Sequence, residues 1–389
     1  MPSSLTKPKP LPPPPKIDLG YIQEILLRLL CQHSPTGYTD PVVRMVSEEL
    51  TSLGIPFELT RRGAIRAELA GKKAGPDRAV VSHLDTLGAM VKALKDNGRL
   101  AVVPVGTWSA RFAEGARVSI FTDEAMFRGT ILPLKASGHT FHTEIDSQPS
   151  TWENLELRVD ENITDRAGLE KLGFHVGDFI GVDASPEISP SGFINARHLD
   201  NKAGVAAMLG AMKATVESGN PLPVDAHMLF TISEETGSGA SAVLHGDVAE
   251  MVSIDNGVVA PGQASRERGV TVAMGDSSGP FDYHLTHALL HLCRAYGIPH
   301  QRDIFKYYRC DSASAVDAGN DIRTALITFG VDSSHGYERT HFHSLESIAY
   351  LVCAYLNSPP LFRREVEPLS DIKGFPKTKT ARVPEPQDL

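Results

Sequence analysis

The sequence predicts an α/β protein with a mostly parallel central sheet flanked by helices and interrupted by an inserted β-rich domain. Short apolar segments alternate with helical patterns in the first and last parts of the chain, which favours parallel strands joined by helices. The middle of the chain has few helical patterns and several short β-rich segments. With 389 residues, the chain is long enough for two domains.

The first elements lead from an extended arm to a buried strand. Residues 1–16 are rich in proline and lysine, which predicts a disordered, semi-rigid arm. Apolar residues at helical spacing predict a helix over Tyr21–Cys31, and a second helix follows at about Asp40–Leu53. Short apolar segments between Phe57 and Val81 are separated by turn residues, so we expect a hairpin that leads into the strand Ala79–Ser82.

The middle of the chain, residues 88–189, is predicted to form the inserted β-rich domain. It consists of short segments with strand character and few helical stripes. The expected strands are Leu100–Val105, Val118–Phe121, Thr130–Leu134 and Leu155–Val159, and the segment Val176–Val182 closes the insertion.

Residues 17–87 and 190–358 are predicted to form one α/β domain that contains the site. Strands and helices alternate again after Ile194. The expected helices are Lys202–Ser218, Gly239–Leu244, Pro280–Tyr296 and Ser344–Leu356, and the expected strands are Ala226–Ile232, Glu250–Ile254 and Thr324–Thr328. The tail, 359–389, is rich in proline and charge and is expected to be loose.

Composition argues against several classes of partner. The net charge is −9 and no long Lys/Arg cluster is present, so a nucleic-acid partner is not expected. The four cysteines are scattered without CxxC spacing, which fits a reducing cytoplasm. The N-terminal residues lack the apolar core of a secretory signal, and no segment has the roughly 20 apolar residues that span a bilayer, so we expect no membrane anchor.

Residues able to bind metals gather at the expected strand ends. His83 and Asp85 follow one strand, Glu234 and Glu235 follow another, and Asp255 follows a third. Asp200 precedes a helix, and several histidines come late in the chain. Because ligands collect at the carboxyl ends of parallel strands, these side chains can converge. Imidazole with several carboxylates suits a pair of zinc, cobalt or manganese ions roughly 3.5–4 Å apart.

Each of these residues also has a simpler structural explanation when taken alone. His83 and Asp85 could form a capped turn, and Asp200 could be a helix N-cap. Glu234 and Glu235 could stabilise a helix N-terminus, and Asp255 could belong to an ordinary turn. Five groups of ligand type at strand ends in one domain are improbable by chance, so together they favour a metal site.

In order along the chain, these motifs resemble those of the M42 metallo-aminopeptidases, a family in the clan of di-zinc exopeptidases. Ser82–Val91 is similar to the family's H-x-D-x-x-G-x-M-V stretch and Asp200–Gly204 to its D-[DN]-[RK]-x-G segment. Ser233–Ala240 resembles E-E-x-G-x-x-G-A, and Asp255 fits the following aspartate. The run Ser334–His341 further resembles the branch linked to the osmoprotectant N-acetylglutaminylglutamine amide.

The resemblance implies a ligand set for two metal ions. Asp200 would bridge both ions, His83 and Asp255 would complete one, and Glu235 with a late histidine would complete the other. It further implies catalytic roles for two carboxylates. Glu234 would be the general base, since a carboxylate that faces the water can hold a proton transiently. Asp85 would orient His83 by accepting the proton of its other ring nitrogen.

The late histidine is open to more than one assignment. Where the family has a segment like R-Y-x-H-S, this chain offers both His341 and His343. We prefer His341, because His343 stands next to Ser344, which can cap the last helix. His335 is a weaker third candidate.

A second departure from the family lies at Tyr308–Ala313, where a G-T-D-A type of loop is more usual. Arg309 could bind an acidic or carboxamide-bearing substrate side chain or could be a plain surface arginine. Cys310 is expected to be a small buried residue, since no Cys/His pair is apparent.

The resemblance implies a cytoplasmic hydrolase that removes N-terminal residues from short peptides. It also implies that the inserted domain mediates homo-oligomers, from dimers to dodecamers. Two other functions stay open from the sequence: an amidase or deacylase for N-acylated or amidated dipeptides, and a non-catalytic metal-binding assembly protein. The presence of Glu234 argues against the second of these.

Overall fold

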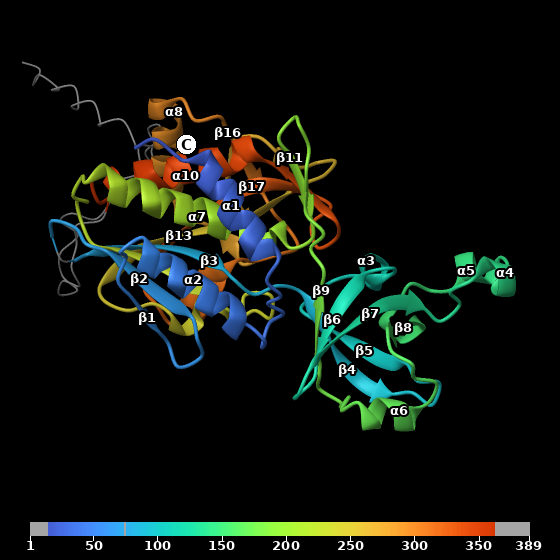
Figure 1. The fold of residues 1–389 in the computed structure, drawn as a ribbon. Helices are drawn as coiled ribbons and strands as arrows, with labels where there is room; N and C mark the ends of the chain where they lie inside the picture. Colours follow the sequence, from blue (N-terminus) through green and yellow to red (C-terminus); the bar gives the residue numbers. More distant parts are fainter. Residues whose placement is uncertain (1–14, 74, 362–389) are drawn as a thin grey trace, which may run out of the picture.

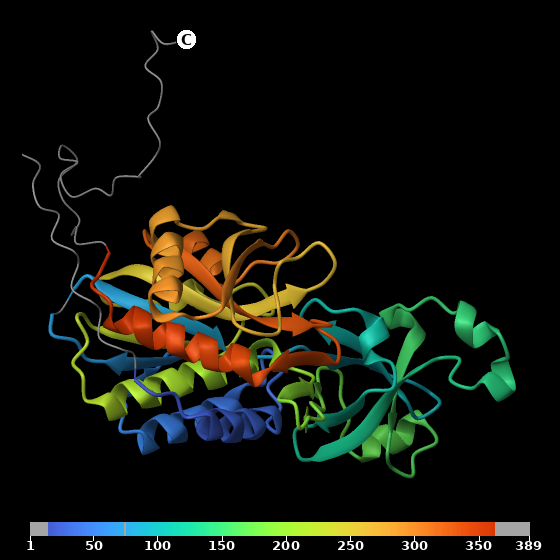
Figure 2. The same ribbon diagram turned by 90° about the horizontal axis from the view of Figure 1, so that it is seen from above.

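The computed structural model describes residues 15–73 and 75–361, which form a large α/β part and a smaller β-barrel beside it (Figures 1 and 2). The predicted fold class, an α/β protein with an inserted β-rich domain, is confirmed. Most of the expected N-terminal arm and C-terminal tail lies outside the described residues. Among the described residues, no helix is long and apolar enough to cross a membrane.

The large part is built on a mixed twelve-stranded sheet, whose main path is parallel in its centre and antiparallel at both ends. In spatial order its main path is β1 (Phe57–Leu59), β2 (Ile65–Leu69), β12 (Ala226–Thr231), β3 (Asp77–His83), β13 (Val248–Val259), β17 (Arg323–Asp332), β18 (Glu338–His341), β11 (Phe193–Ala196) and β10 (Glu187–Ile188). The strands β14 (Val270–Asp276), β15 (Gly279–Pro280) and β16 (His300–Ile304) branch from β17. Among the named strands of the described residues, the parallel pairs are β12–β3, β3–β13, β13–β17 and β14–β16. The edges are antiparallel because short turns join β1 to β2 and β10 to β11, and such turns cannot form a parallel crossover.

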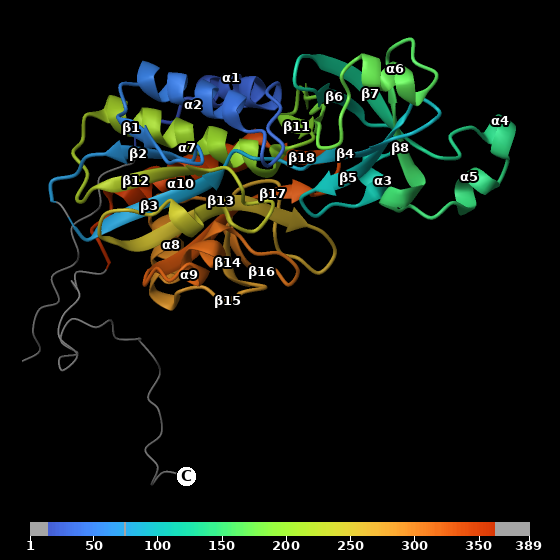
Figure 3. The same cartoon turned by 90° about the horizontal axis from the view of Figure 1, so that it is seen from below.

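Helices cover both faces of the central strands (Figure 3). Their bounds are α1 (Leu19–Leu30), α2 (Asp40–Ser52), α7 (Leu199–Ser218), α8 (Tyr283–Tyr296), α9 (Asp311–Asp317) and α10 (Phe342–Asn357), with the short 3-10 helix η2 (Gly239–Ala242). Ser82 of β3 faces α7, where a side chain at Gly204 would meet its hydroxyl. On the opposite face, Ser253 of β13 hydrogen-bonds to Ser312 of α9 at 2.7 Å. Alternation of side chains along the strands thus separates the two helical layers.

Two helical elements of the large part differ from the sequence prediction. The expected helix Gly239–Leu244 is only the one-turn η2, and α9 was not predicted. The sequence of α9, Asp311–Asp317, has alanines and serines where an amphipathic helix would show large apolar residues, so it gave no periodic signal.

The inserted part is a closed barrel of six antiparallel strands. In order around the barrel they are β4 (Gly88–Leu94), β5 (Leu100–Val105), β8 (Leu155–Val159), β7 (Met126–Pro133), β6 (Arg117–Phe121) and β9 (Phe179–Val182). Short helices connect them: α3 (Ala110–Ala113), α4 (Gly138–Phe141), α5 (Glu144–Ser147), η1 (Trp152–Asn154) and α6 (Arg166–Lys171). The barrel encloses its own apolar core, including the fully buried Val118, Ile120 and Leu157. Closure leaves no unpaired barrel edge.

Candidate active site

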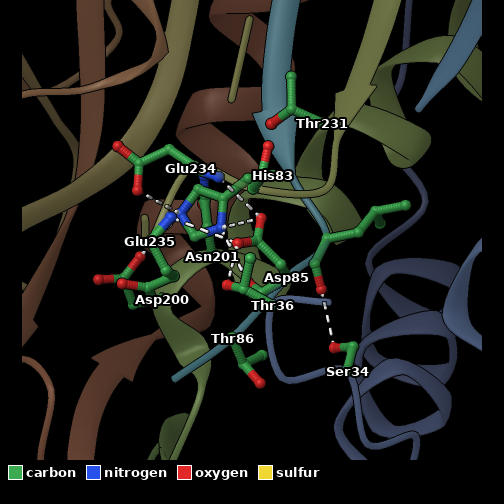
Figure 4. Close-up of polar contacts among 12 residues, drawn as sticks. Ser34, Thr36, His83, Asp85, Thr86, Asp200, Asn201, Thr231, Glu234 and Glu235 are labelled. Carbon is green, nitrogen blue, oxygen red and sulfur yellow. Dashed lines mark hydrogen bonds and ion pairs between the residues drawn. The ribbon is translucent and has the colours of Figure 1, made fainter. Parts of the chain in front are cut away.

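The candidate ligands converge near the carboxyl ends of the central parallel strands, where ligands are expected to bind in an α/β sheet. His83 is the last residue of β3, and Glu234 and Glu235 lie just after β12 (Figure 4). Asp200 is in the first turn of α7. Asp255 lies within β13, which continues four residues past it instead of ending before it.

One group of carboxylates surrounds the buried ring of His83. Its Nε2 atom lies 3.2 Å from Asp200 Oδ1, 3.8 Å from Glu234 Oε2 and 3.9 Å from Asp255 Oδ1. The other ring nitrogen, Nδ1, contacts the backbone carbonyl of Asp85 at 2.9 Å. Because a carbonyl only accepts, it holds the proton on Nδ1 and leaves the lone pair of Nε2 facing the carboxylates.

A second histidine, His335, completes the cluster from the turn between β17 and β18. Its Nε2 atom lies 3.2 Å from Asp200 Oδ2 and 3.8 Å from Glu235 Oε2. Its Nδ1 atom contacts the carbonyl of Thr107 at 2.8 Å, which fixes the same kind of tautomer. Asp200 therefore lies between two imidazoles, with one oxygen toward each.

The preference for His341 is not supported, because its side chain is used elsewhere. His341 is the N-cap of α10, where Nδ1 accepts the backbone N–H of His343 at 2.9 Å. Its Nε2 atom contacts the carbonyl of Ser191 at 2.9 Å. The sequence reasoning assigned the capping role to Ser344, whereas the hydroxyl of that residue donates to the carbonyl of Gly269.

The carboxylate of Asp85 lies 3.7 Å from His83 Nδ1, so its predicted role toward that ring stays a prediction, and it has other partners. It orients His83 through its backbone carbonyl, while its side chain accepts the backbone N–H groups of Glu234 and Glu235 at 3.1 and 3.3 Å. The hydroxyl of Thr36 donates to it at 2.6 Å. Asp85 thus holds the turn that carries the paired glutamates.

Sequence reasoning missed a buried glutamate that supports the site. Glu338 Oε2 accepts the backbone N–H of Asp200 at 3.0 Å, and Oε1 accepts that of His335 at 2.9 Å. Burial, followed by the nearby charge of Asp200, raises the pKa of Glu338 to about 8. Glu338 gave no signal in the sequence, since its partners are the backbone N–H groups of Asp200, 138 residues away, and of His335, three residues away.

The charges of the cluster are unbalanced without a cation. Burial raises the pKa values of Glu234, Glu235 and Asp255 well above their usual range, and neighbouring carboxylates add to the shift. Burial also raises the pKa of Asp200, but the adjacent imidazoles of His335 and His83 outweigh it and lower that pKa. Asp200 Oδ1 and Glu235 Oε1 are buried and lack a hydrogen-bond donor. Converging lone pairs and orphaned oxygens fit divalent metal ions.

The cluster opens into a cavity of about 1050 Å³, and the cluster carboxylates and Asp332 form part of its wall. Trp108 of the inserted part and Tyr308 of the α/β part both line it. Arg309 also lines it, and its guanidinium pairs with the exposed Asp317 at 2.6 Å. Cys310 is buried, as predicted, and burial raises the pKa of its thiol well above its usual range, which disfavours a nucleophilic thiolate. All four cysteines are free thiols.

Comparisons with known proteins agree with the fold. The family model for the M42 glutamyl aminopeptidases matches residues 63–351. A putative aminopeptidase of Bacillus subtilis (strain 168), YhfE, is 36% identical over 337 residues, which cover 86% of this chain and 97% of that protein. The glutamyl aminopeptidase of Lactococcus lactis is 26% identical over 206 residues, or 52% of this chain and 56% of that protein.

Solved structures share the fold at low sequence identity. The TET aminopeptidase of a marine sediment Thaumarchaeota archaeon has a TM-score of 0.79 at 17% identity, covering 86% of this chain and 96% of that one. The TET1 peptidase of Pyrococcus horikoshii, described as assembling into a tetrahedron or a large octahedral shell, has a TM-score of 0.76 at 20% identity, covering 86% and 99%.

The fold and the cluster together define a metal-dependent peptidase. The chain belongs to the M42 peptidase family. The predicted enzyme class, an aminopeptidase acting on peptides, is thereby confirmed, whereas the finer assignment to an osmoprotectant branch stays a prediction.

Proposed function

We propose that this aminopeptidase removes N-terminal residues from short peptides with two divalent metal ions shared by one bridging carboxylate. The position of Asp200 carries the proposal, because its two oxygens each face a different imidazole at 3.2 Å. His83 and Asp255 would complete the coordination of one ion, and Glu235 and His335 that of the other. His335 replaces His341 in this set.

The chemistry divides between the ions and the protein. Bound divalent ions lower the pKa of a water molecule and polarise the scissile carbonyl. Glu234 would accept the proton of the attacking water and pass it to the leaving nitrogen. Its Oε2 atom is 3.8 Å from His83 Nε2, so it lies beside the proposed ligands. Asp85 would keep this glutamate in place through the backbone N–H of Glu234.

A carboxylate outside the proposed metal set favours substrates with a free amino terminus. Asp332 lines the cavity, and its carboxylate is 53% exposed, so it would attract an ammonium group on entry. An N-acylated peptide carries no such charge. This difference supports aminopeptidase action over removal of an acyl group.

The identity of the metal and the assembly are further parts of the proposal. Imidazoles with carboxylates suit zinc, while cobalt and manganese also accept this set. We propose a homo-oligomer, from dimer to dodecamer, assembled through the inserted barrel in a cytoplasmic setting. The assembly described for the TET1 peptidase supports this. Light scattering tests the assembly, because a monomeric mass would exclude it.

The experiment that tests the function compares two substrate classes on metal-depleted and metal-resupplied protein. We expect turnover of aminoacyl anilides only after zinc, cobalt or manganese is returned, and little turnover of N-acetylated dipeptide amides. Preferred turnover of the acetylated amides would identify a deacylase or amidase instead. Full activity after complete metal removal would exclude the two-metal mechanism.

A further inference from the structure

A second group of metal-binding side chains lies at the other end of the same strands. Glu68 of β2 is directly opposite His227 of β12 in the antiparallel pairing. His245 follows η2, and its ring is 4.3 Å from that of His227 between centroids. His227 lies near the start of β12, whereas Glu234 lies beyond its end. Thr231, the last residue of β12, is four residues beyond His227, so about 13 Å of strand separates His227 from the turn that carries Glu234.

The inner nitrogens of both rings meet one oxygen of Glu68. His227 Nδ1 lies 2.8 Å from Glu68 Oε1, and His245 Nε2 lies 2.5 Å from the same atom. One carboxylate oxygen thus faces two imidazole nitrogens. These three side chains are called the edge cluster below.

The outer nitrogen of each ring already faces an acceptor. His227 Nε2 lies 3.2 Å from Asp77 Oδ2, and His245 Nδ1 lies 3.4 Å from the carbonyl of Val243. A neutral imidazole can carry its single proton on this outer nitrogen. In that tautomer the inner nitrogens direct lone pairs at the carboxylate of Glu68, and a positive charge between them would balance all three groups.

Two additional protons or one metal ion could supply that charge. Two protonated rings at 4.3 Å between centroids would repel each other. One divalent cation balances all three lone pairs at once. The carboxylate behind His227 is the usual support of a metal-binding histidine, because it fixes the tautomer and raises the basicity of the ligand. The edge cluster has this support in Asp77, which is itself held by the backbone N–H of Gly75 at 2.8 Å.

The surroundings are closely packed on one side and open on the other. Gly246 has φ +70°, and a Cβ there would lie 3.1 Å from Asp77 Oδ2 and 3.2 Å from His227 Nε2. The side chain of His227 is 7% exposed, while those of His245 and Glu68 are 25% and 36% exposed. Solvent can therefore provide the remaining ligand of a four-coordinate ion.

We propose that Glu68, His227 and His245 bind one zinc-type divalent cation, with Asp77 orienting His227. The ion would tie the loop after η2 to the edge of the sheet. Since that loop continues from the turn that carries Glu234 and Glu235, the ion would stabilise the fold behind the active site without touching the substrate. This proposal does not depend on the number of ions in the active site.

The proposal is tested by comparing the number of zinc ions bound per chain in the native protein and in its variants. The metal-depleted full-length protein is dialysed against Zn²⁺ at pH 7.5, and zinc per chain is measured by mass spectrometry for the native protein, His245→Gln and Glu68→Gln. His291→Gln is the matched control, because His291 is an exposed histidine on α8. We expect both cluster variants to bind one zinc per chain fewer than the native protein and the control.

Two further readouts accompany the zinc count. Zinc should raise the Tm of the native protein more than that of His245→Gln, because only the native cluster gains a ligand. Turnover of an aminoacyl anilide should be similar in His245→Gln and the control, which separates this site from the active site. Equal zinc content in the native protein and in both folded cluster variants would overturn the proposal.

Discussion

Glu338 accepts the backbone N–H of Asp200 at 3.0 Å, so a buried carboxylate fixes the main chain of the residue proposed to bridge two metal ions. Its other oxygen accepts the N–H of His335. One side chain therefore sets the separation of two candidate ligands that lie far apart in the sequence. We infer that Glu338 is a positioning residue for the site.

Replacing Glu338 with alanine should weaken metal binding without removing a ligand. Loss of such a supporting group typically costs about 10–100-fold in metal affinity or activity. Zinc titration of Glu338→Ala should show this loss, and excess zinc should restore part of the turnover. Unchanged metal affinity in a folded variant would exclude the positioning role.

The adjacent glutamates should respond differently to the same substitution. Glu234→Gln should lower kcat by about 10²–10⁴-fold with nearly unchanged metal content, because a general base is lost. Glu235→Gln should reduce metal content, because a ligand is lost. Steady-state kinetics and metal analysis of both variants separate the two roles. Activity preserved in Glu234→Gln would rule out the proposed base.

The two late histidines provide a second matched pair. His335→Ala should lose both bound metal and activity, since its ring faces Asp200 and Glu235. His341→Ala should keep its metal and lose about 1 kcal/mol of stability, the usual cost of removing a helix cap. Metal analysis together with urea unfolding measures both effects. If His341→Ala lost its metal and His335→Ala kept it, His341 would be the ligand, as the sequence predicts.

The barrel contains an ion pair with a predictable dependence on pH. Burial raises the pKa of Glu156, but Lys95 and Arg99 outweigh it and lower that pKa below 4.5. A carboxyl with a lowered pKa in the folded state stabilises fully above its ordinary pKa. This contribution is lost as the pH falls from about 4.5 through the folded-state value.

We therefore expect Glu156→Gln to destabilise the barrel at pH 7 by about 2 kcal/mol, the size of a hydrogen bond to a charged group. The difference from the native protein should shrink below pH 4.5. Urea unfolding at several pH values measures it, with the exposed Glu161→Gln as control. A difference that grows toward low pH would contradict the assigned shift.

Local sequence patterns were sufficient for most elements and for four of the five proposed ligands. His83, Glu234 and Asp200 stand at the ends of strongly apolar strands or at the start of a long helix, so their place in the fold follows from periodicity and chain order. The central sheet was expected to be mostly parallel, and only its centre is. Antiparallel pairing at the edges depends on which strands become neighbours, and periodicity does not report this.

The sequence by itself determined the α/β class, the inserted β-rich part, and the family motifs that carry His83, Asp200 and the paired glutamates. Only the tertiary structure decided that His335 and not His341 joins them, that Glu338 supports them, and that Glu68, His227 and His245 meet. The physical reason is that helix and strand periodicity is a local property of the chain. The direction of a side chain in a turn, and its partner across a sheet, depend on contacts between residues more than a hundred positions apart.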